Sequence, residues 1–260
     1  MRQTIPEWER AEIERSAVEA THKDINDLRY SESNIARYLN PPADTWSSLE
    51  YSYYLLGDVN GKTVLDLGCG DGENTVLLSR RGAQVKALDI SDELIKVARH
   101  RLVVNNVHSG VDFFVGSAHG LPLADESIDV VFGMAILHHL ELPLVAREVH
   151  RVLRKGGRAI FSEPVRNSKL IKFIRNLIPY RAPDVSPFER PLTDKELRDF
   201  GRAFSAYRSK SFSLPYVNLA QVLPVIRDHI QPLYQFDKAV LQKIPFLGYY
   251  ASIRVIELVK

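Results

Sequence analysis

Residues 63–75 read TVLDLGCGDGENT, and this stretch decides the fold. Its first five residues are rich in branched aliphatic side chains, which is typical of a buried β-strand. Gly68, Gly70 and Gly72 then follow at every second position, and polar residues typical of a helix start come after them. A strand that turns through glycines into a helix leaves backbone N–H groups free, so the stretch predicts a ligand site at the carboxyl end of the strand.

The chain around this stretch alternates short aliphatic strands with longer amphipathic helices. We expect strands at 63–67, 84–88, 111–115, 128–132 and 158–162, and helices at 73–80, 92–105 and 143–153. Strands that alternate with helices in this order predict a parallel sheet wound on both faces. Residues 6–54 carry a helical pattern, a helix is expected at 193–204, and two further strands are expected at 207–214 and 248–258, separated by helical sequence from about 217 to 243.

Composition excludes several classes of protein. The 260 residues carry 34 basic and 32 acidic side chains, with no block of like charge that would indicate a nucleic-acid partner. The single cysteine, Cys69, excludes an internal disulfide and fits a reducing compartment. The N-terminal residues do not resemble a signal peptide, and no apolar run reaches membrane-spanning length, so we expect a cytoplasmic protein.

Two carboxylates mark the strand tips beside the glycine loop. Asp66 lies at the end of the first strand, and Asp89 ends the second, where a carboxylate can accept hydrogen bonds from the hydroxyls of a ribose. The spacing Gly68-x-Gly70-x-Gly72 differs from the dinucleotide fingerprint G-x-G-x-x-G. Because carboxylates beside the loop repel a pyrophosphate and attract an amine or a sulfonium, the residues favour a cationic nucleoside.

With these features the sequence resembles the class I S-adenosylmethionine (SAM) dependent methyltransferases. The first motif, VLDLGCGDG, and the acidic end of the second strand match that family, and GSAHGLPLADESIDVV at 116–131 resembles its third motif. FGMAILHHL at 132–140 resembles the segment after the fourth strand, and EVHRVLRKGGRAI at 148–160 resembles the UbiE-like methyltransferase type 11 branch. The resemblance implies an α/β fold: a doubly wound, Rossmann-like, mostly parallel seven-stranded sheet with an antiparallel C-terminal hairpin and an N-terminal helical cap.

The resemblance also implies the cofactor and the residues that hold it. S-adenosyl-L-methionine is the expected cofactor, and S-adenosyl-L-homocysteine is its product. Many family members have an aspartate where Ser117 stands, so the contact with the adenine is expected to be weaker or made differently here. The expected cofactor-binding residues are Asp66, Gly68, Cys69, Gly70, Gly72, Asp89, Ile90, Ser117, Ala118, Met134 and Ala135.

Two adjacent histidines are the candidate catalytic residues. His139, and less strongly His138, is a candidate general base for an acceptor that must lose a proton, while the alternative is that both histidines only shape the pocket. No metal site is expected, because no companion ligand lies at helical spacing from the pair. His119 is expected at the rim of the adenine site. Cys69 is expected to pack as a small apolar residue and not to act as a nucleophile.

The acceptor is expected to be a small aromatic or apolar molecule, methylated at an oxygen, nitrogen or carbon atom. Tyr30, Tyr38 and His139 are the candidate acceptor-binding residues. We expect two units: an N-terminal helical cap at 1–60, and a SAM-binding domain at 61–260 with a lid insertion at about 164–192. The basic amphipathic helix expected at 168–181 is a candidate for peripheral membrane contact.

Two alternative functions remain open from the sequence. One is an aminopropyl-type transferase that uses the same nucleoside pocket, although no additional acidic constellation for a polyamine is evident. The other is a non-catalytic binding module that keeps the fold and has lost turnover. The sequence does not assign an oligomeric state.

Overall fold

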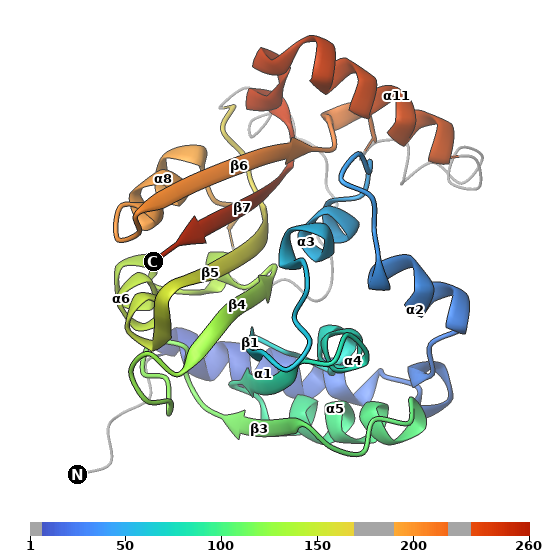
Figure 1. Ribbon diagram of the computed structural model, residues 1–260, viewed down its shortest axis with the longest axis vertical. Coiled ribbons are helices and arrows are strands. Elements are labelled where there is room, and N and C mark those ends of the chain that lie inside the picture. Colours follow the sequence, from blue (N-terminus) through green and yellow to red (C-terminus); the bar gives the residue numbers. More distant parts are fainter. Residues whose placement is uncertain (1–6, 169–189, 218–229) are drawn as a thin grey trace.

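A mixed sheet forms the centre of the computed structural model, which describes residues 7–168, 190–217 and 230–260 (Figure 1). Its seven strands follow the order β3-β2-β1-β4-β5-β7-β6. Strands β1 to β5 are parallel, whereas β7 is antiparallel to both of its neighbours, β5 and β6. The strands are β1 (Thr63–Leu67), β2 (Gln84–Asp89), β3 (Val111–Val115), β4 (Ile128–Met134), β5 (Leu153–Pro164), β6 (Ala206–Phe212) and β7 (Ile253–Val259).

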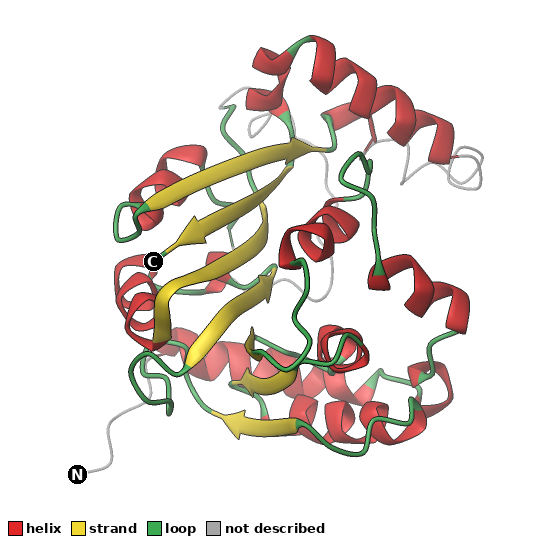
Figure 2. Cartoon of the chain, viewed as in Figure 1, coloured by secondary structure: helices red, strands yellow, loops and turns green. Residues whose placement is uncertain are grey.

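Helices cover both faces of this sheet (Figure 2). The described helices are α1 (Glu7–Thr21), η1 (Ile25–Leu28), α2 (Glu32–Leu39), α3 (Ser48–Leu56), α4 (Glu73–Arg80), α5 (Asp92–Val104), η2 (Leu137–His139), α6 (Leu142–Val152), α8 (Asp194–Gly201), α11 (Ile230–Lys243) and η3 (Pro245–Tyr250). Successive residues of a strand point to opposite faces of the sheet. In β1, Val64 therefore belongs to the buried cluster that includes α3 and α4, whereas Leu65 belongs to the cluster that includes α6 and α8.

The predicted fold class is confirmed, including the antiparallel C-terminal hairpin and the helical N-terminal segment. The helix expected from residue 193 is present as α8, and it opens with a reciprocal capping box formed by Thr193 and Glu196. The strand expected at 248–258 was wrong at its start: Pro245 opens the short helix η3, and β7 begins only at Ile253. The helix expected at 168–181 and most of the expected lid lie outside the described residues.

The division into a cap and a catalytic domain stays a prediction. Helix α1 packs against α5, and α3 packs against β5 and β7, so the N-terminal helices are in contact with the sheet domain. No described helix is long and apolar enough to cross a bilayer.

Gly72 connects the glycine loop to α4 in a conformation that side chains rarely adopt. Its φ is +85°, and a Cβ built there would lie 2.9 Å from the Cβ of Ala98 on α5. Both the left-handed backbone and the close approach of α5 therefore require a glycine.

We expect Gly72→Ala to lower the free energy of unfolding by roughly 1–3 kcal/mol, because the added methyl group is strained and overpacked. Urea denaturation measures this change. The matched control is Gly120→Ala, since a Cβ at Gly120 meets nothing within 4 Å. Equal stability of the two variants would contradict the steric account of the loop.

Candidate active site

A cavity of about 330 Å³ lies at the carboxyl ends of β1, β2 and β4. Nine of the residues expected from the sequence line it together: Gly68, Gly70, Asp89, Ile90, Ser117, Ala118, Met134, Ala135 and His139. We call this space the nucleoside cavity. The parallel sheet brings these residues together because the loops that follow its strands all leave the same edge.

Asp89 fixes the glycine loop to the end of β2. Its carboxylate accepts hydrogen bonds from the backbone N–H of Gly70 at 2.8 Å and of Ser91 at 2.9 Å. The loop is also held by the carbonyl oxygen of Leu88, which accepts from the N–H groups of Gly68 and Cys69. Burial raises the pKa of Asp89, although the two backbone donors oppose that shift.

Asp66 lies beneath the loop. Its side chain is 1% exposed and accepts a hydrogen bond of 2.6 Å from the hydroxyl of Thr75. Burial raises the pKa of Asp66 to about 7. The described lining of the nucleoside cavity does not include Asp66, Cys69 or Gly72. Their assignment to the cofactor therefore stays a prediction.

Cys69 is buried in the same loop. Burial, with Asp66 and Asp89 nearby, raises the pKa of its thiol well above the ordinary value. The thiol therefore stays protonated near neutral pH, which fits a cysteine that packs in the interior and does not act as a nucleophile.

Helix α1 forms one wall of the nucleoside cavity, a role for which no residue of the helix was named from the sequence. Its lining residues recur at helical spacing on one face of the helix: Trp8, Glu12, Arg15, Ser16 and Glu19. That spacing was the available signal, but a face of mainly polar residues is usually a solvated one.

The charges around the nucleoside cavity are mainly negative. Four carboxylates, those of Glu12, Glu19, Asp71 and Asp89, and one guanidinium, that of Arg15, belong to its described lining. Lys23 and Arg101, which stand outside this lining, pair with Asp71, and Arg15 pairs with Glu12 and Glu19. Asp89 is thus the lining carboxylate with no cationic partner among the described residues, and a partly enclosed site with this net negative charge attracts a cation and repels a phosphate.

His138 and His139 occupy the short helix η2, but their surroundings differ. His138 is buried, and its Nδ1 lies 2.9 Å from Glu163 on β5. The other oxygen of Glu163 accepts from the backbone N–H groups of Ile136 and Leu137, so this buried carboxylate fixes the turn after β4. His139 instead reaches Glu12 of α1, whose Oε2 lies 3.4 Å from His139 Nδ1.

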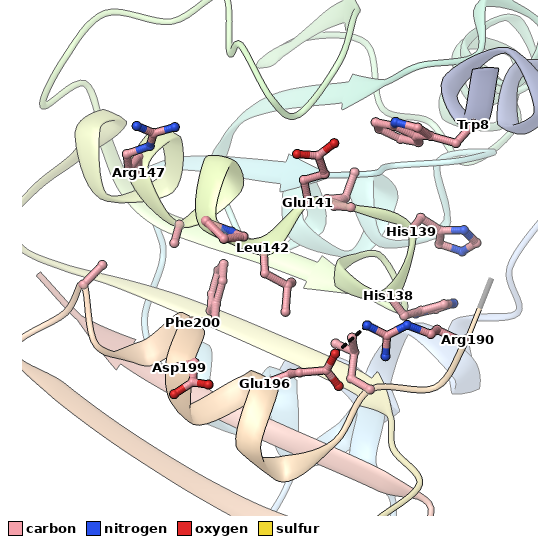
Figure 3. Close-up of a pocket in the computed structure, with 15 residues that line it drawn as sticks. Trp8, His138, His139, Glu141, Leu142, Arg147, Arg190, Glu196, Asp199 and Phe200 are labelled. Atoms are coloured by element: carbon pink, nitrogen blue, oxygen red, sulfur yellow. Dashed lines mark hydrogen bonds and ion pairs between the residues drawn. The ribbon is translucent and has the colours of Figure 1, made fainter. Parts of the chain in front are cut away.

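A second cavity, of about 710 Å³, lies beside the first, between α6 and α8 (Figure 3). We call it the α6–α8 groove. Trp8, His139 and Leu140 line both spaces. The remaining lining residues are His138, Glu141, Leu142, Pro143, Ala146, Arg147, Arg190, Leu192, Glu196, Asp199, Phe200 and Ala203.

Known proteins resemble this chain in both sequence and fold. The methyltransferase domain family matches residues 65–161. A ubiquinone biosynthesis O-methyltransferase of Pseudomonas syringae pv. tomato is 31% identical over 174 residues, which cover 57% of this chain and 73% of that protein. This chain belongs to the class I SAM-dependent methyltransferases, in the type 11 branch.

Several other curated relatives of this methyltransferase are matched over smaller parts of their own length. Methyltransferase GfsG of Streptomyces halstedii is 35% identical over 130 residues, which are 49% of this chain and 47% of GfsG. The chain spans between 21% and 55% of the length of several curated relatives. A geranyl diphosphate C-methyltransferase of Streptomyces coelicolor has the same fold, with a TM-score of 0.59 at 14% identity over 98% of this chain and 97% of that one.

The predicted family is thus confirmed, and with it S-adenosylmethionine as the cofactor of that family. The adenine end of its expected site has an unexpected neighbour. Glu9 of α1 accepts a hydrogen bond from the Ser117 hydroxyl and lies 3.3 Å from His119 Nδ1. His119 also packs against Trp8 in a T-shaped contact, with ring centroids 4.8 Å apart, so this histidine joins the loop after β3 to α1.

Tyr30 and Tyr38 of the methyltransferase line neither space, as far as the described residues define them. The Tyr30 ring lies under the guanidinium of Arg101, and Tyr38 packs against the buried Tyr53. Their assignment to the acceptor stays a prediction. Within the described part of the chain, no group of three His, Cys, Asp or Glu side chains is placed to hold a metal ion.

The raised pKa of Asp66 makes stability depend on pH. Between the unfolded value near 4 and the folded value of about 7, the folded state keeps a proton that the unfolded state has lost. Stability therefore falls as pH rises through this window. We expect Asp66→Asn to reduce the fall in unfolding free energy between pH 5 and pH 8 by about 2–3 kcal/mol.

Urea denaturation of the cofactor-free protein at both pH values measures this difference. The control is Asp112→Asn, because Asp112 is exposed on β3. An unchanged pH dependence in Asp66→Asn would show that Asp66 titrates as an ordinary surface carboxylate.

Proposed function

We propose that this chain transfers a methyl group from SAM to a hydroxyl of a small acceptor with an aromatic or apolar body. The observation that carries the proposal is the meeting of the two cavities at His139. The nucleoside cavity would hold the cofactor, and the α6–α8 groove would hold the acceptor. The reacting atoms would then meet at the wall that Trp8, His139 and Leu140 share.

The proposed orientation of the cofactor follows the strand order. Asp89 accepts the ribose hydroxyls at the end of β2, and Ser117 with Ala118 contacts the adenine after β3. Met134, the last residue of β4, and Ala135 after it lie at the methionine end. The excess of carboxylates suits the ammonium and sulfonium groups of SAM, and this charge balance supports SAM over a dinucleotide with a pyrophosphate.

The proposed reaction is a direct displacement. The acceptor oxygen attacks the methyl carbon, the carbon–sulfur bond breaks, and its electron pair stays on the sulfur of S-adenosylhomocysteine. The acceptor loses its hydroxyl proton to His139, which returns it to solvent. Because the sulfonium is already activated, the protein mainly aligns the two reactants and excludes water.

The acceptor class follows from the groove and from the relatives. Its described wall includes Leu142, Pro143, Leu192 and Phe200, which suit an apolar or aromatic body. Three relatives at 28–31% identity are named as ubiquinone biosynthesis O-methyltransferases, which supports a hydroxyl as the methylated group. An arylamine is the alternative that the experiment below separates.

The test supplies tritium-labelled SAM with two matched acceptors, 4-octylcatechol and 4-octylaniline. They share an apolar tail and an aromatic ring and differ in the nucleophilic group. We expect label to transfer to the catechol. Transfer to the aniline alone would overturn the assignment of a hydroxyl acceptor, and transfer to neither would count against an acceptor with this body.

We expect Asp89→Ala to weaken S-adenosylhomocysteine binding at least tenfold, because the ribose hydroxyls lose a charged acceptor. Isothermal titration calorimetry measures the affinity. Asp112→Ala serves as the control, since Asp112 is exposed on β3, pairs with Lys86 and is not part of the described cavity lining. Equal affinity of the Asp89 variant and the wild type would refute the ribose assignment.

We expect His139→Ala to lower the turnover number with a catechol acceptor roughly 100-fold, which is the usual contribution of a general base. The affinity for S-adenosylhomocysteine should change less than threefold, because the proposed role concerns the acceptor proton. Unchanged turnover in this variant would leave His139 as a residue that only shapes the pocket.

A further inference from the structure

We infer that Glu12 of α1 is a positioning residue for His139: its carboxylate holds the Nδ1–H group of the imidazole and so leaves Nε2 to accept the proton of the acceptor. The inference rests on the proposed function, because it concerns the same base. It adds a residue of the N-terminal helix to the groups that act on the acceptor proton.

The contact between Glu12 and His139 is largely shielded from water. Glu12 Oε2 lies 3.4 Å from His139 Nδ1, and the two side chains are only 13% and 14% exposed. Helix α1 and the turn after β4 are distant in sequence, so only the fold brings this carboxylate and this imidazole together. Both residues also line the nucleoside cavity.

Arg15 fixes the orientation of the carboxylate. Its Nε donates to Glu12 Oε1 at 3.0 Å, and its Nη2 contacts the same oxygen. Arg15 is itself held by Glu19, one turn further along α1. The bonds to Oε1 leave Oε2 directed to His139.

Glu12 remains ionised over the working pH range. Burial opposes its charge, but the hydrogen bonds from His139 and Arg15 outweigh burial and lower the pKa of Glu12 to about 2. An ionised carboxylate has no proton to donate, so the hydrogen atom of this contact must be on His139 Nδ1.

This contact selects one tautomer of the imidazole. A neutral histidine has one protonated nitrogen and one with a lone pair, and the partner of the first decides which nitrogen remains basic. Glu12 on Nδ1 therefore places the lone pair on Nε2. The neighbouring His138, whose ring centroid lies 4.1 Å away, does not compete for Glu12, because its own Nδ1 is directed to Glu163.

The position of Glu12 on α1 makes the orientation of the base depend on how this helix is seated. Contacts that seat the helix include Glu9 with Ser117, Trp8 with His119, and Lys23, just after the helix, with Asp71. They hold α1 against the nucleoside cavity, and so hold Glu12 beside His139.

The test is the tautomer of His139, measured by long-range ¹H–¹⁵N correlation NMR on the protein without cofactor or acceptor. We expect the Nδ1–H tautomer to dominate in the wild type. In Glu12→Leu, which has no acceptor atom, we expect the population to move towards Nε2–H. Glu12→Gln keeps one acceptor oxygen and should give an intermediate population.

The matched control is Glu14→Leu, because Glu14 lies on the same helix but is exposed. In this variant the tautomer population of His139 should equal that in the wild type. An unchanged tautomer in Glu12→Leu would overturn the inference. If Glu12→Leu fails to fold, an unchanged tautomer in Glu12→Gln overturns it instead.

The tautomer readout is independent of the proposed reaction. Failure of the wild type to bind S-adenosylhomocysteine, with a tautomer that still depends on Glu12, would refute the proposed function and leave the contact intact.

With 4-octylcatechol as acceptor, we expect Glu12→Leu to lower the turnover number at least tenfold with little change in the KM of the catechol. Glu12→Gln should recover part of the turnover number. A fall confined to KM would overturn the positioning role.

Discussion

The site depends first on the carboxylate of Asp89. By accepting the N–H groups of Gly70 and Ser91, it joins the loop after β1 to the turn after β2 at the edge of the sheet. Both segments then present their backbones to one cavity. Glycine is needed in the loop because its positive φ angles and the close approach of α5 exclude a side chain at Gly72. A single buried acid thus sets the geometry on which the cofactor site is built.

Much of the fold and half of the site could be predicted from local patterns. The alternation of aliphatic strands with amphipathic helices determines a doubly wound sheet, and such a sheet brings the residues after each strand together. Gly68, Asp89 and Met134 could be found in this way because each lies at the end of a strand or directly after it. The same reasoning gave a start for β7 that was too early, since Pro245 begins a short helix that strand propensity does not reveal.

The wall formed by α1 could not be predicted, because its contacts are long-range. Trp8, Glu12 and Glu19 lie on one face of the helix, but a polar face gives no sign of what it covers. Glu163 was missed for a related reason: a carboxylate in a strand of otherwise apolar residues has a meaning only when its partners, Ile136, Leu137 and His138, are known. The cavity that a helix covers and the partners of a buried carboxylate are both set by tertiary structure.

The central claim is that the nucleoside cavity takes an adenosyl cation. The most direct measurement is calorimetric titration of the wild type with SAM, S-adenosylhomocysteine and NAD under the same conditions. The account predicts binding of both adenosyl compounds and no binding of NAD, because carboxylates line the cavity that a pyrophosphate would have to enter. Binding of NAD without the adenosyl compounds would contradict it.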